Sequence, residues 1–198
     1  MRLLSPDLWL KQAKSDRTAS GLVDLPECHR RYLLQQAYEK SVKALGLALL
    51  PRKSAKDKRV RAALGDCFLH HHTPMTIFLA KDDTTWGLEL RGAYGGDWQQ
   101  ILKILKGLRQ MIALNMRAEA DSQTVDAWTK IDGTRPTKKS DAVSYRYPFV
   151  DDAHPDGITP HEWTGWGTYQ GEEDVVRRAV DNLIARAGQQ IAEWNRSI

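Results

Sequence analysis

The sequence predicts an all-α fold, a bundle of four to five helices with a long loop rich in Trp, Gly and Pro before the last helix. Apolar residues recur at spacings of three and four in several segments, as they do on one face of a helix. Residues that start or stop helices stand at the ends of these segments. The stretch at about 132–171 collects Pro, Gly, aromatic and polar residues, and loops of this length tend to be functional. A chain of 198 residues suits a single domain, 1–198, that carries this loop as an insertion.

The first two helices are marked by their ends. Ser5 followed by Pro6 is a favourable start, because a serine oxygen can cap free amides and proline suits the first helical position. This helix should run to about residue 19. The second helix should run from about residue 26 to residue 50, where Pro51 stops it.

The second helix carries a polar stripe. Gln35, Glu39 and Lys43 stand four residues apart and therefore share one side of the helix. Glu39 precedes Lys43 in the order that favours an ion pair on a helix surface. The helix is either an ordinary core helix of a bundle, or its charged stripe faces something specific.

Three less regular segments follow the second helix. Residues 52–61 form the most basic stretch of the chain, and residues 72–80 are typical of a short helix opened by Thr73 and Pro74. The glycine-rich stretch 82–97 is interpreted as a loop with a short extended piece.

Two amphipathic helices complete the predicted order. Asp97 should cap a long helix that runs toward residue 128, and the last helix should begin at about residue 172 with acidic residues in its first turn. The apolar stripe of the long helix comprises Trp98, Ile101, Leu102, Leu105, Leu108 and Ile112.

Composition narrows the class of protein. Hydrophobic residues make up 41% of the chain and charged residues 27%, the balance of a soluble domain, and the net charge of +4 permits a polyanionic partner without requiring one. The start of the chain does not resemble a secretory signal, and no apolar run approaches the ~20 residues that span a bilayer. Cys28 and Cys67 are too few for a disulfide scaffold, so we expect a cytoplasmic protein with reduced thiols.

The order of several short segments is familiar. These are WLKQAKSDRTA at 9–19, QQAYEKSVKAL at 35–45, a His-Thr pair at 72–73, SYRYPF at 144–149, and the amphipathic last helix. Together they resemble the HEPN domain, a family of α-helical bundles, most clearly over residues 8–50.

The resemblance implies a helical bundle that often forms a homodimer with a cleft between subunits. Many such domains are ribonucleases, and others are proposed to bind nucleotides, often beside a small nucleotidyltransferase partner. The ribonucleases usually carry an Arg followed four to six residues later by a His, and no His of this chain has an Arg at that distance upstream. We therefore expect binding without catalysis.

The expected nucleotide or RNA contacts are Lys40, Lys43, His72, Arg146 and Tyr147. Arg146 could hold a phosphate while a neighbouring tyrosine stacks on a base, or it could pair with a carboxylate beside a proline turn. The two lysines could neutralise a nucleotide, or they could belong to an exposed helix with surface ion pairs.

Other basic and aromatic residues have more than one possible role. The basic stretch 52–61 could contact nucleic-acid phosphates or serve as a solvated linker. Trp163, Trp166 and Tyr169 could stack on bases, dock a partner, or fold back to seal the end of the bundle.

We expect no metal site and no cofactor. Cys67 and His70 would supply only two ligands, whereas a zinc ion takes four, and adjacent histidines on a helix point in different directions.

Three functional hypotheses result. The first is a cytoplasmic, homodimeric HEPN-type protein that binds nucleotide or RNA. The second is a divergent, metal-independent ribonuclease of the toxin–antitoxin or defence type, in which Arg146 stabilises charge and His72 or His154 moves the proton. The third is an interaction module whose Trp-rich loop docks a nucleotidyltransferase-type partner.

Overall fold

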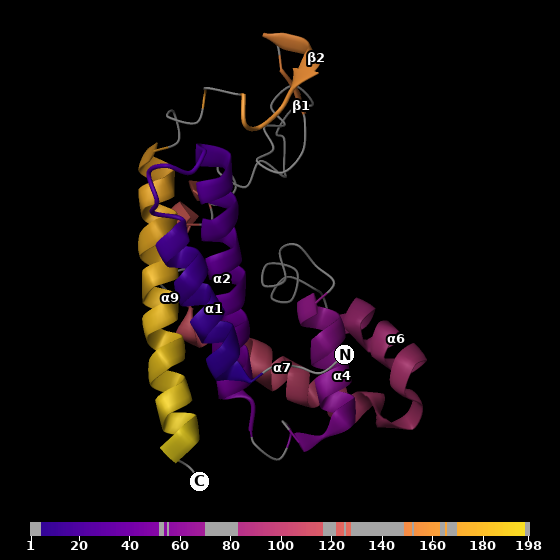
Figure 1. The fold of residues 1–198 in the computed structure, drawn as a ribbon. Helices are drawn as coiled ribbons and strands as arrows, with labels where there is room; N and C mark the ends of the chain where they lie inside the picture. Colours follow the sequence, from indigo (N-terminus) through magenta and orange to yellow (C-terminus); the bar gives the residue numbers. More distant parts are fainter. Residues whose placement is uncertain are drawn as a thin grey trace. The chain divides into compact units, whose positions relative to one another are not determined.

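The computed structural model describes residues 5–51, 54, 56–69, 83–116, 122–124, 126–127, 149–151, 153–162, 165 and 170–196. Within this part of the chain there are six α-helices, which are α1 (Pro6–Ala19), α2 (Glu27–Leu49), α4 (Lys58–Leu69), α6 (Asp83–Tyr94), α7 (Trp98–Asn115) and α9 (Gln170–Arg196) (Figure 1). A 3-10 turn, η1 (Gly95–Asp97), leads into α7. Strand β1 (Phe149–Asp151) pairs antiparallel with β2 (His154–Ile158).

The predicted all-α class is confirmed, and so are the first two helices. Helix α1 occupies the predicted residues, and α2 differs from the prediction by about one residue at each end. Both helices were located from signals within a few residues of their ends, which tertiary packing does not override here. The short helix predicted at 72–80 lies outside the described residues.

Two predictions about elements are wrong, and the first concerns residues 83–94, which form helix α6 rather than a loop. Within the predicted long loop at 132–171, the described residues include the β1–β2 hairpin. Helix α7 ends at Asn115 rather than running toward residue 128, because Met116 leaves helical geometry at φ −101° and ψ 18°. Glycines predict a loop at 83–94, but the lack of a side chain at Gly87 fits its close approach to the Trp98 ring. A Cβ at this position would lie 3.3 Å from the Trp98 ring.

The chain forms two compact units, the first built from three stretches and the second from two. Unit 1 comprises residues 1–11, 39–117 and 185–198, and unit 2 comprises residues 12–38 and 118–184. Helices α1, α2 and α9 each contribute one portion to unit 1 and the other portion to unit 2.

Unit 2 is held by a small apolar core between its portions of α2 and α9. Leu34 and Ala37 of α2 are buried with Val176 and Val180 of α9, and Ala127 completes the cluster. These residues are three or four apart on their helices, so each helix presents one apolar side. Burying a side chain of the size of valine or leucine contributes about 1.5–3 kcal/mol. The core therefore joins these two helical portions firmly.

Ion pairs of two kinds join the helices of unit 2. Arg31 of α2 contacts Glu173 of α9 at 3.3 Å, and both side chains are almost fully buried. Glu173 also accepts a hydrogen bond from Arg177, whose guanidinium reaches the backbone carbonyl of Ser20. The second kind is exposed, and joins Arg17 of α1 to Asp181 of α9 through two hydrogen bonds of 2.7 and 2.8 Å.

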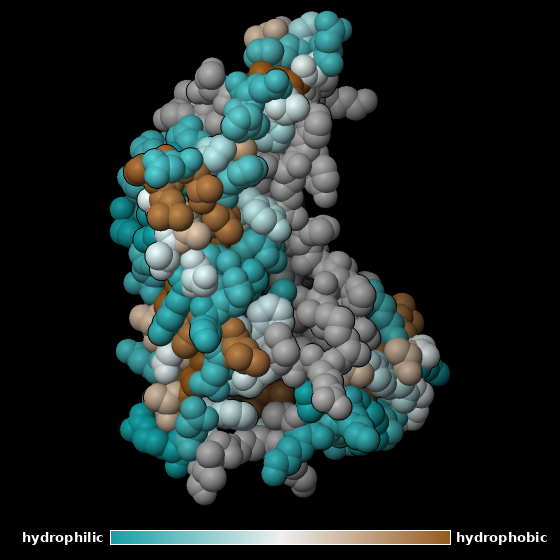
Figure 2. All heavy atoms as spheres, viewed as in Figure 1, coloured by the Kyte–Doolittle hydropathy of each residue, from teal (hydrophilic) through white to brown (hydrophobic). Residues whose placement is uncertain are grey.

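The turn between α1 and α2 in unit 2 exposes apolar side chains. Leu22 is 53% exposed and Val23 is 84% exposed. Figure 2 shows brown spheres gathered over the end of the helices where α1 leads into α2.

Unit 1 is built around α7. The buried side chains of α7 are Ile101, Leu105, Leu108 and Ile112, at spacings of four, three and four. Helices α4 and α6 both pack against α7. Other buried members of unit 1 include Val42 and Leu45 of α2, Val60 of α4, Leu90 of α6 and Ile191 of α9.

The two kinds of ion pair in unit 2 should differ sharply in their contribution to stability. Glu173→Gln removes a counter-charge from the buried guanidinium of Arg31, so we expect a loss of about 3–5 kcal/mol in the free energy of unfolding. Asp181→Asn breaks an exposed pair on the same helix and should cost about 1 kcal/mol or less. Urea denaturation followed by circular dichroism measures both. Equal losses in the two variants would contradict this assignment.

Candidate functional site

Most of the residues predicted to form the site lie outside the described part of the chain. Their roles in nucleotide binding, catalysis or partner docking stay predictions. They are His72, Arg146, Tyr147, Trp163, Trp166 and Tyr169.

Lys43 is described, and it is buried. Its side chain lies in unit 1 with Trp9 of α1, and its Nζ is 4.9 Å from the centre of the indole ring. Lys43 is only 9% exposed, and Glu39, one turn earlier on α2, is 8% exposed. An ammonium at this distance from a tryptophan ring is attracted to its face. Lys43 therefore does not lie on an exposed helix surface, which was one of the two alternatives for it. The other lysine, Lys40, is half-buried.

Burial changes the acid–base chemistry of Lys43. Desolvation lowers the pKa of the Lys43 ammonium, and the charge of Glu39 opposes this effect. The cation is thus held inside unit 1 at a cost that Trp9 and Glu39 offset in part.

Because Lys43 is buried, the stability of the folded chain should depend on pH. Because its pKa is lower in the folded chain than the usual value of about 10.4, the unfolded chain binds more protons between these two values. The wild type should therefore gain stability over Lys43→Met as the pH rises through this interval. Thermal melting of both proteins from neutral pH to about pH 10 measures the difference. A difference that does not change with pH would overturn the prediction.

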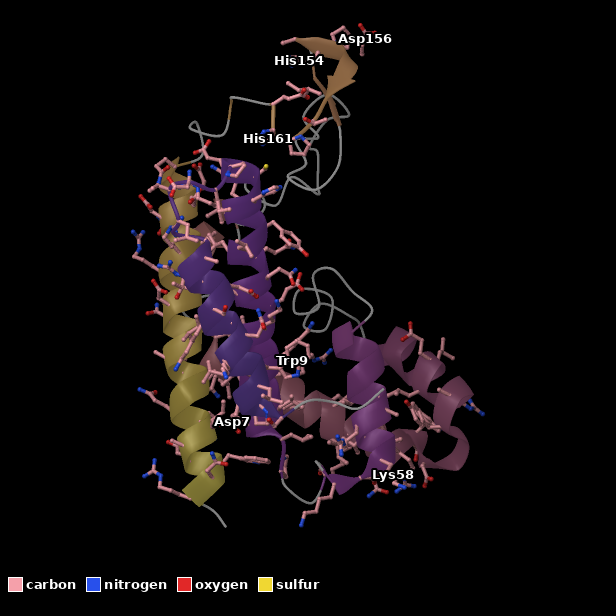
Figure 3. All side chains as sticks on the ribbon, in the orientation of Figure 1. Asp7, Trp9, Lys58, His154, Asp156 and His161 are labelled. Carbon is pink, nitrogen blue, oxygen red and sulfur yellow. The ribbon has the colours of Figure 1, made fainter. Side chains whose placement is uncertain are left out.

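His154 lies on β2, where it is half-buried. Asp156 follows it on the same strand, and His161 comes after the strand (Figure 3). No group of three or more His, Cys, Asp or Glu residues in the described part of the chain could hold a metal ion.

The basic stretch contains an arginine that is already engaged. Arg59 of α4 contacts the carboxylates of Asp57 and Asp97, and its backbone N–H donates to Asp57 Oδ1 at 2.8 Å. Asp57 directly precedes α4, so its carboxylate caps free amides at the start of the helix. These hydrogen bonds with Arg59 lower the pKa of Asp57, and the two carboxylates raise the pKa of Arg59. Arg59 thus links the start of α4 to Asp97 at the start of α7, and it is less suited to hold a phosphate.

The stability that the Asp57 carboxylate contributes as a helix cap should be lost in acid. Its folded-state pKa is lowered, so its stabilising contribution is present above the unfolded value of about 3.9 and is lost as the pH falls through the folded value. The melting temperature of the wild type should exceed that of Asp57→Asn at neutral pH. The two should converge as the pH falls from about 3.9 through the folded value of the Asp57 pKa. Parallel curves across this range would show that the charge of Asp57 does not contribute.

A groove of about 480 Å³ lies along the face of α7 opposite to its buried stripe. Leu102 and Lys106 follow Trp98 at spacings of four, and Lys103 and Gly107 follow Gln99 in the same way, so two adjacent rows of side chains line it. The described lining residues are Trp98, Gln99, Leu102, Lys103, Lys106, Gly107 and Gln110.

The lining of the α7 groove combines apolar side chains with positively charged ones. Trp98 and Leu102 provide the apolar part, and Lys103 and Lys106 provide two ammonium groups one turn apart. A tryptophan face accepts planar rings, and ammonium groups bind anionic oxygens as point charges. Gly87 of α6 lies close to the Trp98 ring, since a Cβ at Gly87 would be 3.3 Å from it. The arrangement suits a ligand with a flat ring and a negatively charged end.

The apolar pattern of the sequence does not predict this groove. The pattern includes Trp98 and Leu102 in the apolar stripe of the long helix, whereas the structure buries neither completely. Two lysines one turn apart beside a glycine in mid-helix are the signal in the sequence that could have found it.

No family model, curated protein or solved structure matches this chain. In the described residues, no helix combines the length and the apolar character that crossing a membrane requires.

Proposed function

We propose that the protein is a HEPN-type helical protein that binds nucleotide or RNA, with the α7 groove as its ligand site. The observation that carries the proposal is the lining of this groove, in which the Trp98 ring is followed by Lys103 and Lys106. Stacking of a base on an aromatic side chain is worth about 1–3 kcal/mol. Lysines that neutralise phosphates add affinity that falls as the salt concentration rises.

The HEPN part of the proposal rests on the resemblance of the sequence and on the helices. Helices α1, α2 and α9 contain three of the segments on which the resemblance is based. The QQAYEKSVKAL segment lies within α2, and most of its side chains are buried. The homodimer, the cytoplasmic location, the nucleotidyltransferase partner and the ribonuclease alternative stay predictions.

The proposal predicts that two lysines carry much of the ligand's negative charge. Removing both ammonium groups with Lys103→Ala and Lys106→Ala should weaken binding of ADP or of a short single-stranded RNA by about tenfold or more. The double variant should also show a smaller dependence of affinity on salt than the wild type. Isothermal titration calorimetry at two salt concentrations measures both effects.

The chain provides a matched control. Lys11 and Lys14 are exposed on α1 and are also three residues apart, so their double alanine variant removes the same charge outside the groove. It should bind as the wild type does, apart from a small uniform effect of net charge. An equal loss in both double variants would reduce the lysine effect to long-range electrostatics and would remove the support for the groove.

A further inference from the structure

We propose that the α7 groove takes a single nucleotide rather than a strand, with the base on Trp98, the phosphates between Lys103 and Lys106, and Gly107 leaving the space that the phosphates occupy. This inference rests on the proposed function and assigns a ligand class and an orientation to its site. It draws on the order of the groove residues, the size of the groove, and the glycine in mid-helix.

The order of the groove residues matches the order of parts in a nucleotide. A helix rises 1.5 Å per residue, so Lys103 and Lys106 lie roughly 7.5 and 12 Å along the helix axis from Trp98. Leu102 lies between the ring and the more distant lysine and provides an apolar surface for a sugar. A base stacked on Trp98 thus places its ribose near Leu102 and its phosphates near the two ammonium groups.

The size of the groove favours one nucleotide. Its volume of about 480 Å³ lies within the range of roughly 300–1,000 Å³ that is typical of small-molecule sites. Proteins that bind single strands place successive bases on successive rings along a basic groove. Among the described residues that line this groove, Trp98 is the only aromatic one.

The third observation is a glycine inside helix α7, Gly107. It lies within α7, where glycine is unfavourable relative to alanine, and its backbone is not in the left-handed region that favours glycine. At Gly87 of α6 a Cβ would come close to the Trp98 ring, which accounts for a glycine there. At Gly107, by contrast, no described heavy atom lies within 4 Å of a Cβ built on the backbone. Neither backbone geometry nor packing against the described residues explains this glycine. What it does provide is open space beside Lys103 and Lys106.

A substitution at Gly107 that fills this open space without destabilising the helix tests the inference. Gly107→Gln adds a side chain to the groove, and Gly92→Gln adds the same side chain to an exposed site on α6 that is also open. Both changes replace glycine in a helix with a better helix former, so both variants should melt at or above the temperature of the wild type. Loss of binding by the first variant is then not a loss of folding.

The probes are adenosine, AMP, ADP, ATP and a short single-stranded RNA, titrated by calorimetry. The affinity of the wild type should rise by about tenfold or more from adenosine to ADP, as phosphates engage the ammonium groups. Gly107→Gln should weaken ADP by about tenfold or more, and Gly92→Gln should bind ADP as the wild type does. Trp98→Leu should weaken adenosine as well as ADP, because it removes the stacking surface for the base.

The outcomes separate this inference from the proposed function. If the RNA binds and the mononucleotides do not, the single-nucleotide assignment is overturned while the proposed function stands. If ADP binds equally to the wild type and to Gly107→Gln, the placement of the phosphates beside Gly107 is overturned. If no probe binds to the wild type, the inference and the proposed function both fail.

Discussion

The burial of one apolar stripe on α7 determines how unit 1 presents its surface. Ile101, Leu105, Leu108 and Ile112 are all buried, and each contributes about 1.5–3 kcal/mol of hydrophobic stabilisation. This burial fixes the rotation of α7 about its own axis. Because the helix can turn only one side inward, the rows that contain Lys103 and Lys106 must face outward. The groove is thus a consequence of core packing, and its chemistry is set by residues that the core leaves free to vary.

The buried charges of the protein have structural partners, and this directs attention away from them as ligand contacts. In unit 2, the guanidinium of Arg31 contacts the carboxylate of Glu173, which also accepts from Arg177. In unit 1, the ammonium of Lys43 lies over the Trp9 ring. A buried charge without such partners would be strongly destabilising. Arg31 and Lys43 of α2 therefore have an explanation within the fold.

The elements that could be predicted from the sequence are those specified by neighbouring residues. Helix α1 begins at Pro6 directly after Ser5, α2 ends just before Pro51, and α7 begins where its apolar periodicity begins. Helix α6 was missed because Gly87 is unfavourable in a helix when judged locally. The reason for this glycine is the Trp98 ring of another helix, which no local signal reveals. The burial of Lys43 depends in the same way on Trp9, a distant residue in the chain.

The start of α7 explains why its side chains, rather than its backbone, are suited to hold an anion. The first amides of a helix attract negative charge, so an open helix start is a common phosphate site. At α7 a negative charge already stands at this end, because Asp97 is the N-cap residue. Its carboxylate makes no capping hydrogen bond to the helix and is instead held by Arg59 of α4. A second anion at this end would meet the charge of Asp97, whereas Lys103 and Lys106 lie beyond the first turn. The same ion pair that anchors α7 to α4 thus favours a phosphate position along the groove, with the Trp98 ring left for the base.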